Sequence, residues 1–265
     1  MIESRYIRQE IMPQIGESGQ ALLAQAQVAI VGLGALGSVS SEILARSGVG
    51  YLRLIDRDVV ELSNLQRCAL YTEEDANAAT SKALAARDHL KSINSTIYTE
   101  PQVCEVNSSN VLKLLSGVDL ILDGSDNFEV RALINEAANK LGIPWIYTGV
   151  LGALSMVMPI LPGGPCLRCL SPTVPEPGSY PTCTTNGVLP STTRIAATLQ
   201  ATQALKLLLN KPKLPSIPLK ELPTTTLYQI EVWEPEFEMV TVEKNPACAV
   251  CGLHHYELLE NHDLL

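Results

Sequence analysis

A glycine-rich turn followed by an acidic residue is the first pattern in this chain that could perform chemistry. Residues 28–31 form an apolar run that predicts a buried strand, and the segment GLGALG, from Gly32 to Gly37, follows directly. A helical pattern then continues to Ala45, and a second apolar run ends in Asp56. This is the order of a nucleotide-binding βαβ unit, in which the helix N-terminus faces phosphates and the acidic residue binds ribose hydroxyls. A tight packing turn without a ligand is the simpler alternative.

Four of the seven cysteines form two Cys-x-x-Cys pairs, Cys166 with Cys169 and Cys248 with Cys251. Turn-forming residues flank each pair, and two intervening residues allow both thiolates to face one ion. Two such pairs predict a closed tetrahedral zinc site, which would be structural because it leaves no open coordination position. Buried cysteines without a metal and a redox-active pair are the alternatives. The sequence predicts that this metal ties the C-terminal tail to the start of a long loop.

Further polar residues follow the second and fourth predicted strands. Asn64, Arg67 and Lys82 come after the second strand, and Asp126 follows the fourth. The carboxyl ends of parallel strands face one crevice, so these side chains are expected near the glycine turn. Two cations and a metal-binding carboxylate suit a triphosphate better than NAD. Each residue alone has an ordinary explanation, a solvated lysine or a helix cap, but the set favours ATP.

Composition limits the classes of function. The chain has 265 residues, of which 46% are hydrophobic and 18% charged, and its formal net charge is −9. That balance disfavours binding to nucleic acid, whose phosphates require a basic surface. No apolar run approaches the length of a membrane span, and the N-terminus has no apolar signal segment. We therefore expect a cytoplasmic protein without a disulfide framework, in which Cys68 and Cys104 are packing residues and His254 and His255 lie on the surface.

Alternating strand and helix patterns predict an α/β fold. Strands are expected at 28–31, 51–55, 96–103, 119–123 and 145–150, with helices between them, so the sheet should be Rossmann-like, mostly parallel and covered by helices on both faces. After residue 150 the pattern changes. A strand at 153–161 is followed by a long loop at 171–190, a helix at 195–209 and a hairpin at 227–232 and 238–242. We expect antiparallel strands in this C-terminal half, which extend the same sheet.

The motifs together resemble those of the ThiF/MoeB/HesA adenylyltransferases, bacterial relatives of ubiquitin-activating enzymes. The shared segments occur in the family's order and spacing, and they are RYIRQ, GLGALG, LIDRDVVELSNLQR, Lys82, DGSDN, PCLRC, PTCTTNGV and NPACAVCG. The resemblance implies ATP and Mg²⁺ as cofactors, and the activation of the C-terminal glycine of a small ubiquitin-like sulfur carrier protein as an acyl-adenylate. Asp56 would hold the ribose and Asp126 the Mg²⁺. The nucleotide-contacting set that it implies is Gly32, Gly34, Ala35, Gly37, Asp56, Ser63, Asn64, Leu65, Gln66, Arg67, Lys82, Asp126 and Asn127.

Two more residues gain a role from the resemblance. Arg8 resembles the arginine that reaches into the partner's active site in family homodimers. Cys183 matches the position of the family's sulfur-handling or thioester-forming cysteine in a mobile loop, where it is either catalytic or an accessory thiol. Ala35 stands where many relatives have glycine, and the segment before Lys82 lacks a glycine that is often found there.

These observations lead to one expectation about the whole chain. Residues 1–265 should form one ThiF-type adenylation domain, with a nucleotide-binding half (1–150) and a half (151–265) that carries the carrier-binding surface, the crossover loop and the zinc. No rhodanese domain follows the last cysteine pair, so a separate sulfur donor is expected, in thiamin or molybdopterin synthesis. The alternatives are adenylation of a peptide or small-molecule carboxylate, and a nucleotide-binding scaffold without turnover.

Overall fold

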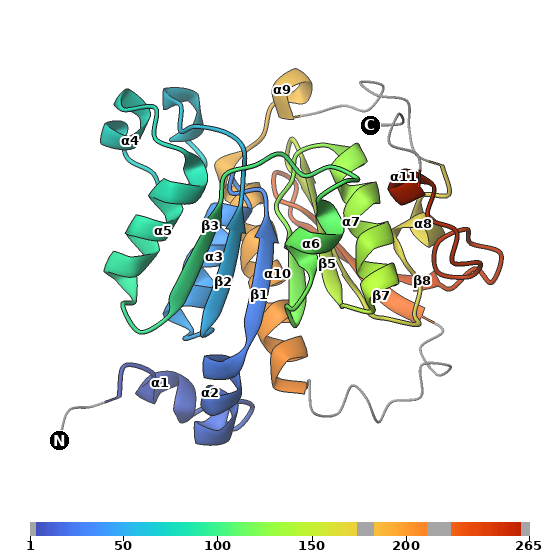
Figure 1. Ribbon diagram of the computed structural model, residues 1–265, viewed down its shortest axis with the longest axis horizontal. Helices are drawn as coiled ribbons and strands as arrows, with labels where there is room; N and C mark the ends of the chain where they lie inside the picture. Colours follow the sequence, from blue (N-terminus) through green and yellow to red (C-terminus); the bar gives the residue numbers. More distant parts are fainter. Residues whose placement is uncertain (1–3, 174–182, 211–223, 261–265) are drawn as a thin grey trace.

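A single sheet of eight strands runs through the molecule in the order β3-β2-β1-β4-β5-β6-β7-β8 (Figure 1). The computed structural model describes residues 4–173, 183–210 and 224–260. The strands are β1 (Gln27–Val31), β2 (Tyr51–Ile55), β3 (Tyr98–Gln102), β4 (Leu120–Asp123), β5 (Trp145–Leu151), β6 (Leu154–Ile160), β7 (Thr224–Glu231) and β8 (Glu236–Glu243). Strands β1 to β5 pair in parallel and β6 to β8 in antiparallel fashion, which confirms the predicted mixed α/β sheet.

Helices cover both faces of the parallel strands. The longer ones are α2 (Gly16–Gln25), α3 (Gly37–Arg46), α5 (Lys82–Ile93), α7 (Phe128–Leu141) and α10 (Pro190–Asn210). The short ones are α1 (Ile7–Glu10), η1 (Leu62–Asn64), α4 (Glu73–Asn77), α6 (Val111–Leu115), α8 (Leu167–Leu170), α9 (Cys183–Asn186) and α11 (Glu257–Glu260). None of the helices in the described part of the chain combines the length and apolar character that crossing a membrane requires.

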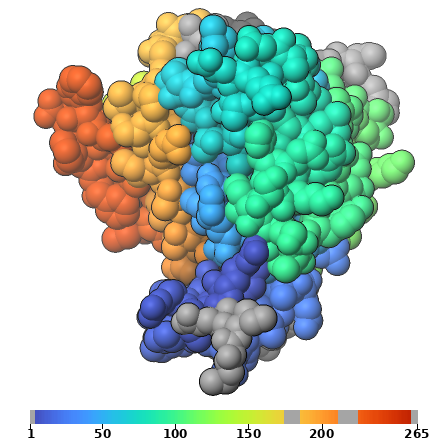
Figure 2. Space-filling view, turned by 90° about the vertical axis from the view of Figure 1, so that its left-hand side faces the viewer, coloured from blue at the N-terminus to red at the C-terminus, as the bar shows by residue number. Residues whose placement is uncertain are grey.

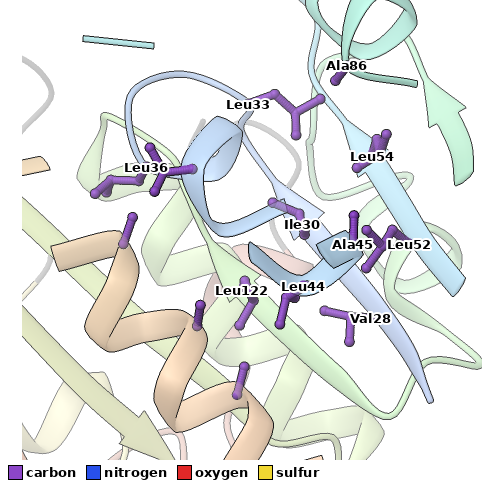
Figure 3. Close-up of a cluster of buried hydrophobic side chains, with 14 of the residues drawn as sticks. Val28, Ile30, Leu33, Leu36, Leu44, Ala45, Leu52, Leu54, Ala86 and Leu122 are labelled. Carbon is purple, nitrogen blue, oxygen red and sulfur yellow. The ribbon is translucent and has the colours of Figure 1, made fainter. Parts of the chain in front are cut away.

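Strand β1 is buried on both of its faces because its residues alternate between two hydrophobic clusters. Val28 and Ile30 pack against α3, α5 and α10 in one cluster (Figure 3). Ala29 and Val31 pack against α6 and α7 in the other. A strand covered on both faces has no need of polar alternation, which explains the continuous apolar run in the sequence.

The strand order reverses between β1 and β4. Strands β2 and β3 follow on one side of β1, whereas β4 and β5 lie on the other. Ligands of open α/β sheets bind at such a point, outside the carboxyl ends of the strands, because the connections leave there in opposite directions and open a crevice. The glycine turn after β1 and the segment after β4 flank this point.

The helix before the closing hairpin differs from its prediction. It begins at Pro190 rather than at residue 195, since proline is tolerated in the first turn of a helix. Ile195 is 38% exposed, while Ala197 and Ala201 are fully buried. Small side chains face inward because α10 packs closely against α3, β5 and β6. The predicted loop at 171–190 contains the one-turn helix α9 in its described part.

Helices α1 and α2 lie at the end of the molecule opposite to α4 and α9 (Figures 1 and 2). Gln9 fixes α1 there by donating a hydrogen bond of 2.9 Å to the carbonyl oxygen of Ser47, just past the C-terminus of α3. Because α3 begins at the glycine turn and has ten residues, α1 lies about 15 Å from that turn along the helix axis.

Candidate functional site

A cavity of about 510 Å³ opens at the carboxyl ends of the first four strands, where the strand order reverses between β1 and β4. This volume is within the range of small-molecule sites. Its walls come from the residues that follow β1, β2, β3 and β4. The lining residues are Val31, Gly32, Ile55, Asp56, Arg57, Asp58, Cys104, Glu105, Val106, Asn107, Ser125, Asp126, Asn127, Glu129, Val130 and Leu133.

Three glycines bring the backbones of β1, α3 and β4 into contact beside this cavity. Gly32 has a φ of +84°, a conformation that favours glycine. A Cβ on Gly37 would lie 1.9 Å from the carbonyl oxygen of Gly32, and one on Gly124 would lie 2.4 Å from the same oxygen. A Cβ on Gly34, by contrast, would meet nothing within 4 Å. Close packing therefore requires glycine at positions 32, 37 and 124, whereas Gly34 has open space beside it.

Asp56 connects the glycine turn to the end of β2. Its two carboxylate oxygens accept hydrogen bonds from the backbone N–H groups of Leu33 (2.7 Å) and Asp58 (2.8 Å). Burial raises the pKa of Asp56, although these two hydrogen bonds and the charge of Lys82 act in the opposite direction. A carboxylate has about four acceptor positions, so Asp56 keeps capacity for a ligand hydroxyl while it holds the turn.

Lys82, the first residue of α5, is only 8% exposed and reaches the rim of the cavity through an ion pair. Its Nζ lies 2.9 Å from the Oδ2 of Asp58, which belongs to the cavity lining. Burial lowers the pKa of Lys82, but the charge of Asp56 and the contact with Asp58 outweigh it and raise that pKa overall. The ammonium group is therefore charged, and its present partner is one that an anionic ligand could replace.

The segment from Ser63 to Arg67 has mixed local roles. Asn64 is buried, and its Oδ1 accepts a hydrogen bond of 3.1 Å from the backbone N–H of Glu61. Leu65 packs against the hydrophobic core, and Gln66 is exposed. The half-buried Arg67 donates from Nη1 to the carbonyl oxygen of Ser63 at 2.8 Å. None of these residues lines the cavity itself.

Cys68 shows that the predicted cations lie near Asp56. The charges of Arg67, Lys82 and Asp56 all act on this buried thiol. Burial is the strongest influence and raises the pKa of Cys68, so its thiol stays protonated. Burial also raises the pKa of Cys104, which lines the cavity. Both thiols are thus poor nucleophiles, which agrees with their predicted role in packing.

Asp126 and Asn127 lie on the opposite wall from Asp56, after β4. Asp126 is exposed and lines the cavity. Asn127 caps α7, because its Oδ1 accepts a hydrogen bond of 2.9 Å from the backbone N–H of Val130. The structure therefore brings Gly32, Asp56 and Asp126 to one cavity.

Arg8 and Cys183 lie outside this group for different reasons. Arg8 is exposed on α1, at the far end of α3, and cannot reach the cavity of its own chain. Cys183 is the first residue of α9, and its side chain lies outside the described part of the structure. Gly152, just after β5, exchanges backbone hydrogen bonds with Gly187 and Leu189, so α9 lies near the carboxyl end of β5.

Sequence reasoning did not identify the buried ion pair of Asp123 and Arg131. Asp123, fully buried at the end of β4, accepts hydrogen bonds from the backbone N–H (2.9 Å) and the hydroxyl (2.6 Å) of Ser125. The Nε of Arg131 lies 3.2 Å from the other carboxylate oxygen, and its Nη2 donates to the carbonyl oxygen of Ser125. Burial raises the pKa of Asp123, and Arg131 opposes that shift. The pair fixes the turn before Asp126. The sequence signal that could have identified this pair is Asp123 itself, an acidic residue at the end of an apolar strand.

Gln200 connects this turn to two helices. Its Nε2 donates to the carbonyl oxygen of Asp123 at 2.7 Å, and its Oε1 accepts from the hydroxyl of Ser40 on α3 at 2.6 Å. Gln200 is fully buried in α10, so both bonds are shielded from water. The C-terminal half of the chain thereby contributes to the geometry of the cavity.

The four cysteines of the two Cys-x-x-Cys pairs meet beside α7, on the face of the sheet opposite to α10. Their sulfur atoms all lie within 4.8 Å of one another. The Sγ atoms of Cys166 and Cys248 are 3.6 Å apart and those of Cys169 and Cys251 are 3.4 Å apart, which is too far for a disulfide. A tetrahedral zinc site with Zn–S bonds of about 2.3 Å requires sulfurs about 3.8 Å apart, so the cluster fits zinc. It brings together residues more than 80 positions apart in the chain.

Comparison with known proteins places these features in a family. The sequence pattern described as the ThiF family matches residues 6–250. The chain is 39% identical to the sulfur carrier protein ThiS adenylyltransferase of Bacillus subtilis, over 96% of this chain and 73% of that protein. It is 37% identical to the SAMP-activating enzyme E1 of Haloferax volcanii, over 98% of this chain and 92% of that protein. The crystal structure of Escherichia coli MccB with ATP has the same fold, with a TM-score of 0.78 and 23% identity over 95% of this chain and 75% of MccB.

The contrast between Gly124 and Gly34 yields a prediction about stability. Gly124→Ala should lower the free energy of unfolding by about 1–3 kcal/mol, because its Cβ would overlap the carbonyl oxygen of Gly32. Gly34→Ala should remain within about 0.5 kcal/mol of the wild type, because its Cβ meets open space. Urea denaturation of both variants measures this difference, and equal losses of stability would contradict it.

Proposed function

This chain belongs to the ThiF family, and from that premise we propose that it is an ATP-dependent adenylyltransferase acting on a small sulfur carrier protein. The C-terminal glycine carboxylate of the carrier attacks the α-phosphorus of ATP, a new bond from carboxylate oxygen to phosphorus forms, and pyrophosphate leaves. The product is an acyl-adenylate. The Bacillus subtilis and Haloferax volcanii relatives, named for activating ThiS and SAMP proteins, support this substrate class.

The observation that carries the proposal is the shared cavity of Gly32, Asp56 and Asp126. The glycine turn and the N-terminus of α3, with Gly34, Ala35 and Gly37, would receive phosphate oxygens, because the first N–H groups of a helix have no partner within the helix. Asp56 would bind the ribose. The apolar residues Val106 and Leu133 provide surface for a base.

Charge balance supports cations as part of the site. Of the charged residues that line the cavity, Asp56, Asp58, Glu105, Asp126 and Glu129 are acidic, and Arg57 is basic. Such a lining repels a triphosphate unless cations intervene. Mg²⁺, when bound, would neutralise charge on the phosphate oxygens, and Asp126 would hold it.

Side chains close to the cavity would supply the remaining positive charge. Lys82 and Arg67, with Ser63 and Asn64 beside them, would contact the phosphates, and their present partners are Asp58 and the carbonyl oxygen of Ser63. The reaction needs no protein base, since a carboxylate is already nucleophilic. Positioning and charge neutralisation would supply most of the rate enhancement.

A second copy of the chain would complete the site. Arg8 is about one helix length from the cavity of its own chain, and its exposed position allows it to enter the cavity of a partner in a homodimer. Residues 1–150 then form the nucleotide-binding half, and residues 151–265 bind the carrier. Cys183, on α9 near the carboxyl end of β5, would attack the acyl-adenylate, forming a thioester and releasing AMP, or carry sulfur from a separate donor.

Zinc in the Cys166, Cys169, Cys248 and Cys251 cluster would be structural. Four thiolates fill its coordination shell, so no position remains for substrate. The metal would connect the segment after β6 to the segment after β8, two parts of the chain that no strand pairing joins directly.

Pyrophosphate exchange into ATP tests the function. A purified carrier ending in Gly-Gly should stimulate exchange, and Asp126→Ala should lower the rate by at least about 100-fold, because charge neutralisation in the transition state is lost. A carrier lacking its last two glycines is the control. Exchange with another carboxylate would transfer the proposal to a peptide or small-molecule substrate. Binding of ATP without any exchange would indicate a non-catalytic scaffold.

Mixed dimers test the contribution of Arg8. Arg8→Ala and Asp126→Ala should each be inactive alone, whereas co-expressed chains should regain about a quarter of the wild-type activity, because half of the dimers are mixed and each has one intact site. No recovery would show that Arg8 does not act on the partner's site.

Cysteine replacement tests the metal. Cys166→Ser should reduce bound zinc, measured by elemental analysis, and lower the melting temperature, because an incomplete shell binds zinc weakly. Cys104→Ser, outside the cluster, is the control, and its zinc content and melting temperature should equal those of the wild type. Unchanged zinc content in Cys166→Ser would refute the four-cysteine site.

A further inference from the structure

Helix α7 carries a fully buried asparagine, Asn135, that contacts the first cysteine pair. Its Oδ1 accepts a hydrogen bond of 2.9 Å from the backbone N–H of Leu167, which lies between the two cysteines of that pair. Its Nδ2 donates to the Sγ of Cys166 at 3.7 Å. One side chain therefore binds both the backbone and a sulfur of the same turn.

The orientation of this amide follows from hydrogen-bond chemistry. A backbone N–H only donates, so the Asn135 atom facing Leu167 must be the oxygen. The nitrogen is then left pointing at Cys166, which is 1% exposed. An unpaired N–H in such a buried place would be costly.

We propose that Asn135 is part of the metal site, as the residue that positions the Cys166 thiolate and sets how tightly the cluster holds its ion. This inference rests on the zinc proposed above. Four thiolates around Zn²⁺ leave a net negative charge in a buried place, which N–H donors stabilise. The cluster has a second donor of this kind in the backbone N–H of Asn245, 3.5 Å from the Sγ of Cys169. The donor of Asn135 belongs to a side chain, so a substitution can remove it, whereas the backbone donor of Asn245 cannot be removed in this way.

The position of Asn135 gives the proposal a wider consequence. The same helix is capped by Asn127, beside the nucleotide cavity, and carries Arg131, which fixes the turn before Asp126. Residues 127, 131 and 135 are each four positions apart and thus lie along one side of the helix. Asn135 connects the metal cluster to the helix that also supports the cavity.

Asn135→Asp is the decisive substitution, because it keeps the acceptor for Leu167 and removes the N–H donor to Cys166. In the full-length protein loaded with zinc, it should weaken zinc binding 10–100-fold, the usual effect of losing a hydrogen bond to a metal ligand. Competition with a chromophoric chelator measures this. Asn139→Asp, one turn further along α7, is the matched control, since Asn139 contacts Tyr256 rather than a cysteine. Its zinc affinity should remain within about twofold of the wild type, as expected for a residue that does not contact the ligands.

Three results would overturn the inference. They are an unchanged affinity in Asn135→Asp, an equal loss in Asn139→Asp, and a wild-type protein that binds no zinc, which alone would also refute the zinc proposal. A measurement on the wild type covers the case in which Asn135→Asp does not fold. With ¹¹³Cd in place of zinc, the side-chain amide proton of Asn135 should show a scalar coupling to the metal through the N–H···S bond. A wild-type protein that binds cadmium without this coupling would also refute the role of Asn135.

Discussion

The contact of three backbones beside the cavity is the constraint on which the rest of the structure depends. Gly32, Gly37 and Gly124 let β1, α3 and β4 approach more closely than any side chain would allow. This approach aligns the N-terminus of α3 with the crevice between β1 and β4, where the sheet order reverses. It also places Asp56 and Asp126 on two walls of one cavity. Gly32, Gly37 and Gly124 thus serve close packing of the backbone. Gly34 does not, because a Cβ there would meet nothing within 4 Å.

Buried polar groups hold this arrangement in place. Asp123 and Arg131 form an ion pair in which the carboxylate is fully buried, and Gln200 adds a hydrogen bond from α10 to the same turn. Such groups are expensive to bury unless every partner is present, so a small displacement of the turn would cost several bonds together. The cavity therefore has one rigid wall at the end of β4. Outside the cavity lining, Lys82 pairs with Asp58, and Arg67 donates to the carbonyl oxygen of Ser63.

The two halves of the chain depend on each other through helices rather than through the sheet alone. Helix α10 comes from the second half but packs against α3 and the parallel strands of the first. Helix α7 belongs to the first half, and it contacts the cysteine cluster through Asn135 and the segment after it through Glu136, whose carboxylate accepts from the backbone N–H groups of Leu258 and Leu259. The position of the C-terminal tail is thus coupled to the helix that begins at the cavity.

The sequence by itself determined the fold class, the glycine turn with Asp56, and the four cysteines as one cluster. These features depend on local periodicity, turn chemistry and short fixed spacings, which a linear pattern records directly. Its resemblance to the ThiF/MoeB/HesA adenylyltransferases also identified the family. Only the tertiary structure decided which side chains share a cavity, that α10 buries Ala197 and Ala201 while Ile195 is exposed, and that Asp123, Arg131, Gln200 and Asn135 form hydrogen bonds inside the fold. The physical reason is that a polar residue inside a helix or at a strand end looks like a surface residue in sequence. Its role depends on a partner far away in the chain, as with Gln200 and the carbonyl oxygen of Asp123, 77 residues apart.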